Sequence, residues 1–378
     1  MKSVLIAAYV RSPFHFAKKG ALAKVRPDEM AAQVIRGLIE RTKIDPATIE
    51  DVLMGCAMPE GEQGLNIARL VVLLAGLPIT VAGATVNRFC GSSMQGIHMA
   101  AGAIQLNAGE AFICAGVESM SRIPMAGFNP SPHPGLAKDF PGAYMSMGQT
   151  AENVARKYQV TRGDQDAFAV RSQKKAAAAQ AAGKLKDEII SIKGKDGVVE
   201  QDGCIRADST TEVLATLQPA FDTNGSVTAA TSSPLTDGAS AVLVCTEEYA
   251  KRNKIEPLAR LKSVAVAGCA PEIMGIGPVV ATKKALARAE LAVKDLDVIE
   301  LNEAFASQAI ACMRELGLDE TKINLDGGAI ALGHPLGATG ARITGKAAQV
   351  LKREGKRYAL ATQCIGGGQG IASIVERL

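Results

Sequence analysis

The strongest constraint on the fold is an alternation of short apolar strands with amphipathic helices, which occurs twice along the chain. The pattern predicts strands at residues 4–10, 52–57, within 77–84, 110–115, 241–245, 258–266, 298–301 and 357–362. Helices are expected between most of them, for example from Pro27, over 66–75 and over 279–289. Such alternation predicts an α/β protein whose parallel or mixed sheet is covered by helices on both faces.

A weak internal echo predicts that the chain contains two similar halves. Gly91 and Gly109 bracket one expected helix, and Gly337 and Gly355 bracket another. The two pairs lie 246 positions apart in both cases (337 − 91 and 355 − 109). Each of these helices is followed by an expected strand, as a duplicated architecture requires.

The regular alternation of strands and helices stops near residue 119, which predicts an inserted segment. Residues 123–147 are rich in proline and carry apolar side chains without a clear period, which is typical of a functional loop. Two helices follow, the second beginning at Thr161 with Asp164 completing a capping box. We therefore divide the chain into a first half at 1–118, an inserted loop domain at 119–233, a return to the first half at 234–256, and a second half at 257–378.

Composition excludes several classes of function. Hydrophobic residues make up 47% and charged residues 21%, as in a globular protein with a sizeable core. The net charge of +4 is spread along the chain, which argues against nucleic acid as a partner. The most apolar run, 67–86, is broken by Arg69 and Pro78 and predicts no membrane span.

The eight cysteines are scattered and form no Cys-x-x-Cys pair, which argues against a zinc site and a disulfide framework. The chain has only four histidines, none at metal-ligand spacing with carboxylates, so no metal is expected. A reducing compartment, the cytoplasm, is the expected location.

Four polar residues occupy turns where open α/β sheets place their ligands: Cys90, Asn302, His334 and Cys364. Cys90 precedes an expected helix, whose N-terminal N–H groups and dipole would favour the thiolate. Taken singly, each residue has an ordinary structural interpretation, such as a buried small cysteine or a histidine that caps a helix. Two cysteines and a histidine, all in glycine-rich strand-to-helix turns, are together hard to explain by structural roles alone.

Five ordered motifs that span essentially the whole chain resemble the thiolase family. They are Val86–Ser92 (VNRFCGS), Gly116–Ser121 (GVESMS), Asn302–Phe305 (NEAF), Gly333–Arg342 (GHPLGATGAR) and Cys364–Gly370 (CIGGGQG). The resemblance implies two similar βαβαβαββ halves that form a five-layered αβαβα core, with a loop domain inserted in the first half. Thr339 departs mildly from the serine that many members carry.

The resemblance also implies a role for each motif residue. His334 would take the proton of Cys90, whose thiolate attacks the keto carbon of a 3-oxoacyl-CoA. Cys364 would protonate the departing acetyl-CoA carbanion and then deprotonate CoA. One oxyanion site would use His334 and a water held by Asn302, and the other the N–H groups of Cys90 and Gly366.

CoA enters this chemistry as a substrate, and no metal or redox cofactor is required. By the same resemblance, Ser233 would lie near the pantetheine of CoA. Arg206 would lie near its nucleotide, where an arginine suits phosphates. An ordinary surface arginine is the competing interpretation of Arg206.

The short loop at 124–147 and the triplet Thr231-Ser232-Ser233 favour a degradative 3-ketoacyl-CoA thiolase of fatty-acid β-oxidation. A biosynthetic acetyl-CoA acetyltransferase, which condenses two acetyl-CoA, and a non-catalytic acyl-CoA-binding or lipid-binding protein are the alternatives. A ketoacyl synthase would carry a second histidine in place of Cys364. The family implies a homodimer or homotetramer, or a subunit of a β-oxidation complex. Chain-length preference, physiological direction and oligomeric state stay open.

Overall fold

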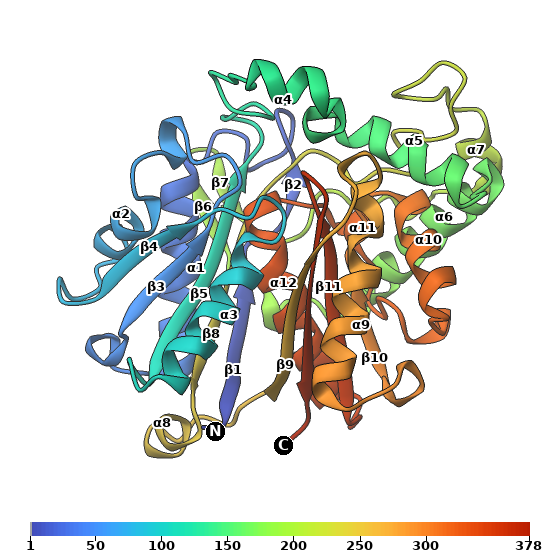
Figure 1. The fold of residues 1–378 in the computed structure, drawn as a ribbon. Helices are drawn as coiled ribbons and strands as arrows, with labels where there is room; N and C mark the ends of the chain where they lie inside the picture. The colour runs from blue at the N-terminus through green and yellow to red at the C-terminus, as the bar shows by residue number, and fades with distance from the viewer. Residues whose placement is uncertain (1) are drawn as a thin grey trace.

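The computed structural model describes residues 2–378, which form two α/β halves and an inserted segment (Figure 1). The first half contains β1 (Val4–Arg11), β2 (His15–Phe16), α1 (Pro27–Thr42), β3 (Asp51–Gly55), α2 (Ile67–Leu74), β4 (Ala82–Val86), α3 (Ser92–Gln105), β5 (Ala111–Ser119), β8 (Thr236–Thr246) and α8 (Glu247–Arg252). The inserted segment contains α4 (Pro134–Asp139), α5 (Met147–Lys157), α6 (Arg162–Ala181), β6 (Ile192–Gly194), β7 (Gly197–Val199) and α7 (Thr211–Ala215). The second half contains β9 (Ala259–Gly268), α9 (Gly277–Ala289), β10 (Val298–Leu301), α10 (Ala306–Leu316), α11 (Ala329–Leu332), α12 (Leu336–Arg353), β11 (Tyr358–Ile365) and β12 (Gln369–Glu376).

The two halves repeat one strand order, so the predicted duplication is confirmed. The sheet runs β10-β11-β12-β9-β1-β8-β5-β3-β4, with β2 beside β8. In each half the later pair is antiparallel, β5 with β8 and β11 with β12, and the preceding pair is parallel, β3 with β5 and β10 with β11. The counterpart of β4 in the second half is reduced to one parallel bridge between Ile299 and Ile323.

Five layers result from the way the two groups of strands enclose a pair of helices. The strands of the two halves pair through β1 and β9, with Leu5 opposite Arg260 and Ile6 opposite Ala259, and Figure 1 shows the strands diverging from this junction. Between them lie α3 and α12, while α1 and α2 cover the outer face of the first half and α9 and α10 that of the second. Three apolar clusters fill the gaps between these layers.

The central helix α12 contacts the strands of the first half at glycines. A Cβ on Gly116 would lie 2.1 Å from the carbonyl oxygen of Gly337, and one on Gly340 would lie 2.3 Å from the backbone nitrogen of Met94. Any side chain at these positions would force the layers apart. The glycines of the GHPLGATGAR motif therefore bring the start of α12 directly onto the strand ends of the first half.

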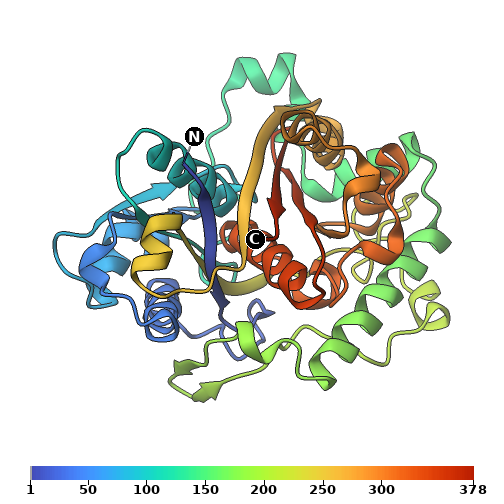
Figure 2. The ribbon, with the colours of Figure 1, turned by 90° about the horizontal axis from the view of Figure 1, so that it is seen from below.

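In the sequence the inserted segment follows β5 and precedes β8, and in the structure it contacts both halves. Figure 2 shows it passing from the side of α1, where β6 lies, to the side of α10 and α11, where α6 packs. The capping box of Thr161 and Asp164 at the start of α6 is confirmed. Within residues 2–378, no helix combines the length and apolarity needed to cross a membrane.

Two local predictions were wrong because tertiary contacts decide these segments. The strand before Cys90 covers 82–86, and it is a half-exposed edge strand, because Pro78 and Val81 close a turn. The sequence Leu-Thr-Asp-Gly at 235–238 predicts a local turn, but β8 begins there at Thr236, since Asp237 pairs with both His15 and Ser119. Two neighbouring strands supply the hydrogen bonds that a local Asp-Gly turn would have made.

Candidate active site

The four predicted reactive residues all lie buried near strand ends or helix starts. Cys90 follows β4 in the turn before α3, and Asn302 directly follows β10. His334 lies between α11 and α12, and Cys364 is the penultimate residue of β11. Each is less than a tenth exposed, so any charge on them is poorly solvated.

Backbone and side-chain contacts fix the turn that carries Cys90. Phe89 adopts a left-handed conformation (φ 43°), which is uncommon for a bulky residue. The Ser92 hydroxyl accepts the Arg88 N–H (2.9 Å) and donates to the Phe89 carbonyl. From the second half, the Gln363 side-chain amide donates to the Cys90 carbonyl. A strained turn held from several sides is typical of a functional position.

The thiol of Cys90 is the resting form, which corrects the expectation of a stabilised thiolate. Burial raises the pKa of Cys90 to about 11, although the N–H groups of Gly366 and of Cys90 itself lower it. The negative charge of Glu118 adds to the increase. Desolvation of the anion outweighs the N–H groups of Gly366 and Cys90, so a base is required to form the thiolate near neutral pH.

His334 is held in the form that such a base needs. Its Nδ1 lies 2.6 Å from the Thr339 hydroxyl, which donates its own proton to the Pro335 carbonyl (2.9 Å). The hydroxyl must therefore accept from Nδ1–H, and Nε2 keeps its lone pair. Burial, assisted by the charge of Arg342, lowers the pKa of His334 to about 3. The imidazole is neutral, with Nε2 3.4 Å from the Asn302 side-chain nitrogen.

A half-buried histidine on α3, His98, makes acid sensitivity testable. Its Nε2 bonds the Ser373 hydroxyl (2.8 Å), and burial lowers its pKa to about 3. Because the unfolded chain binds this proton near pH 6.5, stability is present above that pH and is lost as pH falls toward 3. We expect His98→Gln to lower the slope of unfolding free energy between pH 5.5 and 4 by about 1.4 kcal/mol per pH unit. Urea unfolding of both proteins across this range measures the difference, and parallel slopes would contradict it.

Cys364 and the glycine turn after it complete the cluster. Burial, and then the charge of a Cys90 thiolate, raise the pKa of Cys364 well above its ordinary value. The two sulfur atoms are therefore close enough to influence each other. Gly367 and Gly368 have φ of 77° and 84°, a conformation that favours glycine and turns the Gly366 N–H toward Cys90.

The two predicted CoA contacts lie in different places. Half-buried Ser233 donates its backbone N–H to the Ala304 carbonyl (2.9 Å), which places it beside the Asn302 loop. Arg206 is exposed, with its guanidinium 5.0 Å from the centre of the Phe16 ring, and no described hydrogen bond or ion pair joins it to the reactive cluster.

Thr339 and Gln363 are site residues that sequence reasoning missed as contacts. In the sequence, Thr339 stands out only as a departure from serine, and Gln363 directly precedes the Cys364 motif. Their adjacency to motif residues was the available signal. Spacing alone could not indicate that Gln363 reaches across to the carbonyl of Cys90.

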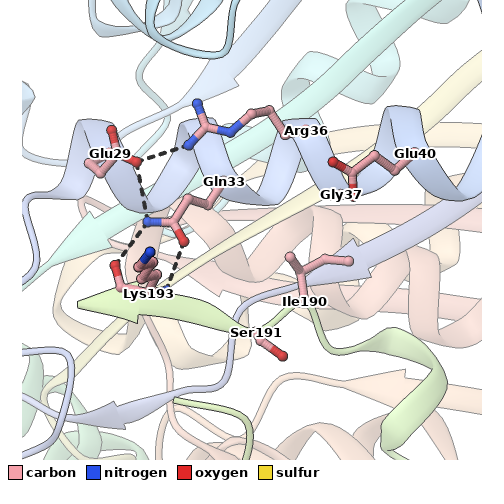
Figure 3. A pocket seen from close by; sticks show the side chains of 8 residues that line it. All are labelled: Glu29, Gln33, Arg36, Gly37, Glu40, Ile190, Ser191 and Lys193. Atoms are coloured by element: carbon pink, nitrogen blue, oxygen red, sulfur yellow. Dashed lines mark hydrogen bonds and ion pairs between the residues drawn. The ribbon is translucent and has the colours of Figure 1, made fainter. Parts of the chain in front are cut away.

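A surface hollow of about 330 Å³ lies away from this cluster, between α1 and the segment that leads into β6 (Figure 3). Its polar groups satisfy one another. The Gln33 amide exchanges two hydrogen bonds with the backbone of Lys193 (2.8 and 3.1 Å), and Arg36 bonds Glu29 (2.9 Å). The hollow therefore lies at the packing interface between α1 and the inserted segment.

Comparisons with known proteins agree with the five motifs. The family models for the thiolase N-terminal and C-terminal domains match residues 4–248 and 255–377. The 3-ketoacyl-CoA thiolases of Shewanella oneidensis and Bacillus subtilis are 50% and 48% identical to this chain, with all of both chains covered. The crystal structure of human mitochondrial 3-ketoacyl-CoA thiolase superposes with a TM-score of 0.92 at 38% identity, covering 100% of this chain and 99% of that one. The structure of the human protein in complex with CoA gives a TM-score of 0.91. The chain belongs to the thiolase family and has the thiolase fold.

Proposed function

We propose that this protein is an acyltransferase that cleaves 3-ketoacyl-CoA with CoA, giving acetyl-CoA and a shortened acyl-CoA. The observation that carries the proposal is a buried pair of thiols close enough for the charge of one to act on the other, with the Gly366 N–H on Cys90 and with Leu336, two residues after the neutral His334, packed against Cys90. His334 Nε2 carries a lone pair that only the Asn302 side-chain nitrogen contacts, at 3.4 Å, and the Gly366 N–H acts on the Cys90 thiol. An acyl-binding protein without catalysis would need none of these groups.

In the first half-reaction, His334 Nε2 takes the proton of Cys90, and the thiolate attacks the keto carbon. The bond between C2 and C3 then breaks. The electron pair on C2 takes the proton of Cys364, and acetyl-CoA leaves while the acyl group stays on Cys90.

In the second half-reaction, the Cys364 thiolate takes the thiol proton of CoA. The CoA thiolate attacks the acyl-Cys90 thioester, and Cys90 leaves and regains its proton from His334. Every group returns to its starting state, so the chemistry requires only CoA and protein side chains.

Two oxyanion sites would stabilise the tetrahedral intermediates. The N–H groups of Cys90 and Gly366 would form one, because both lie beside the Cys90 sulfur, to which the acyl carbonyl is joined in the intermediate. His334 and a water on Asn302 would form the other. The Asn302 side-chain oxygen is buried without a hydrogen-bond partner in residues 2–378, so it is free to accept from such a water.

For CoA, the proposal places Ser233 near the pantetheine and Arg206 near the nucleotide phosphates. The position of Ser233 beside the Asn302 loop supports the first contact. The exposure of Arg206 leaves its guanidinium accessible to an anion. We expect Arg206→Ala to raise the KM for CoA while leaving kcat unchanged, as loss of ground-state binding does.

The degradative direction in fatty-acid β-oxidation is favoured by relatives that carry the name 3-ketoacyl-CoA thiolase. CoA-dependent cleavage of 3-ketoacyl-CoA substrates from four to sixteen carbons tests it. Cleavage of long chains supports the proposal, whereas activity confined to acetoacetyl-CoA would favour the biosynthetic acetyltransferase. Tight acyl-CoA binding without an acyl adduct on Cys90 would favour the non-catalytic alternative.

The hydrogen bond between His334 and Thr339 predicts a specific kinetic change. Thr339→Val keeps the side-chain shape but removes the acceptor for Nδ1–H, so the imidazole loses its orientation. We expect kcat to fall about 10- to 100-fold with little change in KM. Thr339→Ser, which restores the hydroxyl, is the matched control and should keep most of the activity. Equal rates for the valine and serine variants would contradict the role of the hydroxyl.

We further propose a cytoplasmic homodimer. All eight cysteines are unpaired, as in a reducing compartment. Among the described strands, β4 pairs only with β3, so its outer edge is open. Exposed apolar side chains occur on the neighbouring segments: Leu65, Ile79, Phe89, Met99 and Leu106. A second copy would cover such a surface, and light scattering should show a species of twice the chain mass that Met99→Glu with Leu106→Glu weakens.

A further inference from the structure

A buried carboxylate of the first half holds backbone groups of both halves. Glu118 lies near the end of β5 and is only 1% exposed. Its Oε2 accepts the N–H groups of Ala57 (2.8 Å) and Gly337 (2.9 Å). Its Oε1 accepts the Met58 N–H (3.2 Å) and the Gln63 amide (2.7 Å). All four partners are donors, which an ionised carboxylate satisfies and a neutral amide cannot.

These contacts reach the base and the nucleophile at the same time. Gly337 is in the first turn of α12, three residues after His334, so Glu118 anchors the start of the helix next to the base. Cys90 packs in a small apolar cluster with Ala57 and Leu336, the residues that Glu118 bonds or that adjoin its partner. The carboxylate therefore bonds the backbone of a residue that packs against Cys90, and a negative charge there opposes a thiolate.

We propose that Glu118 is a positioning residue: by holding the N–H groups of Ala57 and Gly337 it fixes the start of α12, and with it His334, against the segment that packs on Cys90, and its charge adds to the burial that disfavours the Cys90 thiolate. The inference rests on the proposed function, because the positioning matters for that reaction. A resting thiol would limit unproductive alkylation and oxidation of the nucleophile before substrate binds.

The other titratable groups around the two residues are few. Cys56 lies 3.8 Å from the Glu118 carboxylate, and Gln63 and the backbone donors are neutral. The charge of Glu118 raises the pKa of Cys90, and the charge of a Cys90 thiolate raises the pKa of Cys364. Arg342, on α12, lowers the pKa of His334. Burial raises the pKa of Glu118, and the N–H donors of Ala57 and Gly337 lower it. Glu118 is thus the anion that faces Cys90 from the first half.

Two substitutions separate the effect of the Glu118 charge from the effect of its side-chain length. Glu118→Gln removes the charge, and Glu118→Asp keeps it on a side chain too short to hold Ala57 and Gly337 together. The folded protein is alkylated with iodoacetamide over a range of pH, and peptide mass spectrometry after digestion measures the modified fraction of Cys90. The midpoint of this pH dependence reports the effect of the Glu118 charge on Cys90. Steady-state cleavage of 3-ketoacyl-CoA, with kcat and KM determined separately, reports the positioning.

We expect the alkylation midpoint of Glu118→Gln to fall by about one pH unit, as removal of one charge several ångströms away does. Glu118→Asp should keep the wild-type midpoint, and both variants should lose at least about tenfold in kcat with a smaller change in KM. The matched control is Glu152→Gln, since Glu152 is a buried carboxylate that accepts the N–H groups of Ser226 and Val227 (3.0 and 2.9 Å). Its alkylation midpoint should equal that of the wild type.

A wild-type midpoint in Glu118→Gln, or wild-type kcat in both Glu118 variants, would overturn the proposal. If Glu118→Gln does not fold, Glu118→Asp decides: a lower kcat at an unchanged midpoint supports the proposal, and an unchanged kcat overturns it. Alkylation needs no substrate, so absence of cleavage by the wild-type protein would overturn the proposed function and leave the charge test intact.

Discussion

Cys90→Ala is expected to abolish cleavage of 3-ketoacyl-CoA and formation of the acyl-enzyme. The alanine leaves no group to accept the acyl chain, so kcat should fall by at least about 10⁴-fold, as when the nucleophile of a catalytic unit is removed. The buried site should still bind acyl-CoA, because the substitution removes one sulfur atom. Steady-state cleavage and intact-protein mass spectrometry after incubation with acyl-CoA measure the two losses.

Cys245→Ala is the matched control for this prediction. Cys245 is another fully buried thiol, on β8, and it lies outside the reactive cluster. Its variant should keep wild-type cleavage and the same mass increase. An acyl adduct that persists in Cys90→Ala would place the nucleophile at another residue.

His334→Ala is expected to have the second largest effect. General-base catalysis contributes about 10²- to 10⁴-fold, so kcat should fall by that factor. Because burial raises the pKa of Cys90 to about 11, the residual rate should rise steadily with pH up to that value as hydroxide forms the thiolate directly. In the wild-type protein, His334 stays neutral above its pKa of about 3, so the rate should change little between pH 6 and 9. Rates measured over pH 6 to 10 in both proteins compare the profiles.

His98→Gln serves as the control because it removes another neutral histidine, half-buried, that bonds Ser373 instead of site residues. Its pH–rate profile should follow the wild type. A pH-independent residual rate in His334→Ala would show that another group takes the Cys90 proton.

The positions of the reactive residues could be predicted from sequence because local patterns determine them. Glycine-rich turns after apolar strands place side chains at strand ends, and Cys90, Asn302 and Cys364 all follow that rule. The glycines flanking His334 similarly identified the start of α12. Element identity in these segments depends on short-range spacing, which the sequence carries directly.

The protonation state of Cys90 could not be predicted in this way. The expectation from a helix N-terminus was a thiolate, yet burial, which depends on both halves and on Glu118, determines the pKa. The contact of Gln363 with Cys90 and the extension of β8 through Asp237 likewise join residues that are distant in sequence. Long-range packing decides such features, and local propensity does not.

The unequal ends of the sheet limit how copies of this chain can assemble. At one end β4 offers an open five-residue edge, whereas at the other the corresponding strand is reduced to the bridge of Ile299 with Ile323. A chain with two equivalent open edges could add copies end to end without limit, as a growing fibre does. When only one strand edge is unpaired, two copies related by a two-fold axis can pair these edges with each other, and neither copy then has an unpaired edge left. In the homodimer that we propose, the two copies would cover each other's β4 edge, while within each copy Ile323 and Asn324 bond Ile299 and Leu301 and so cover the outer edge of β10.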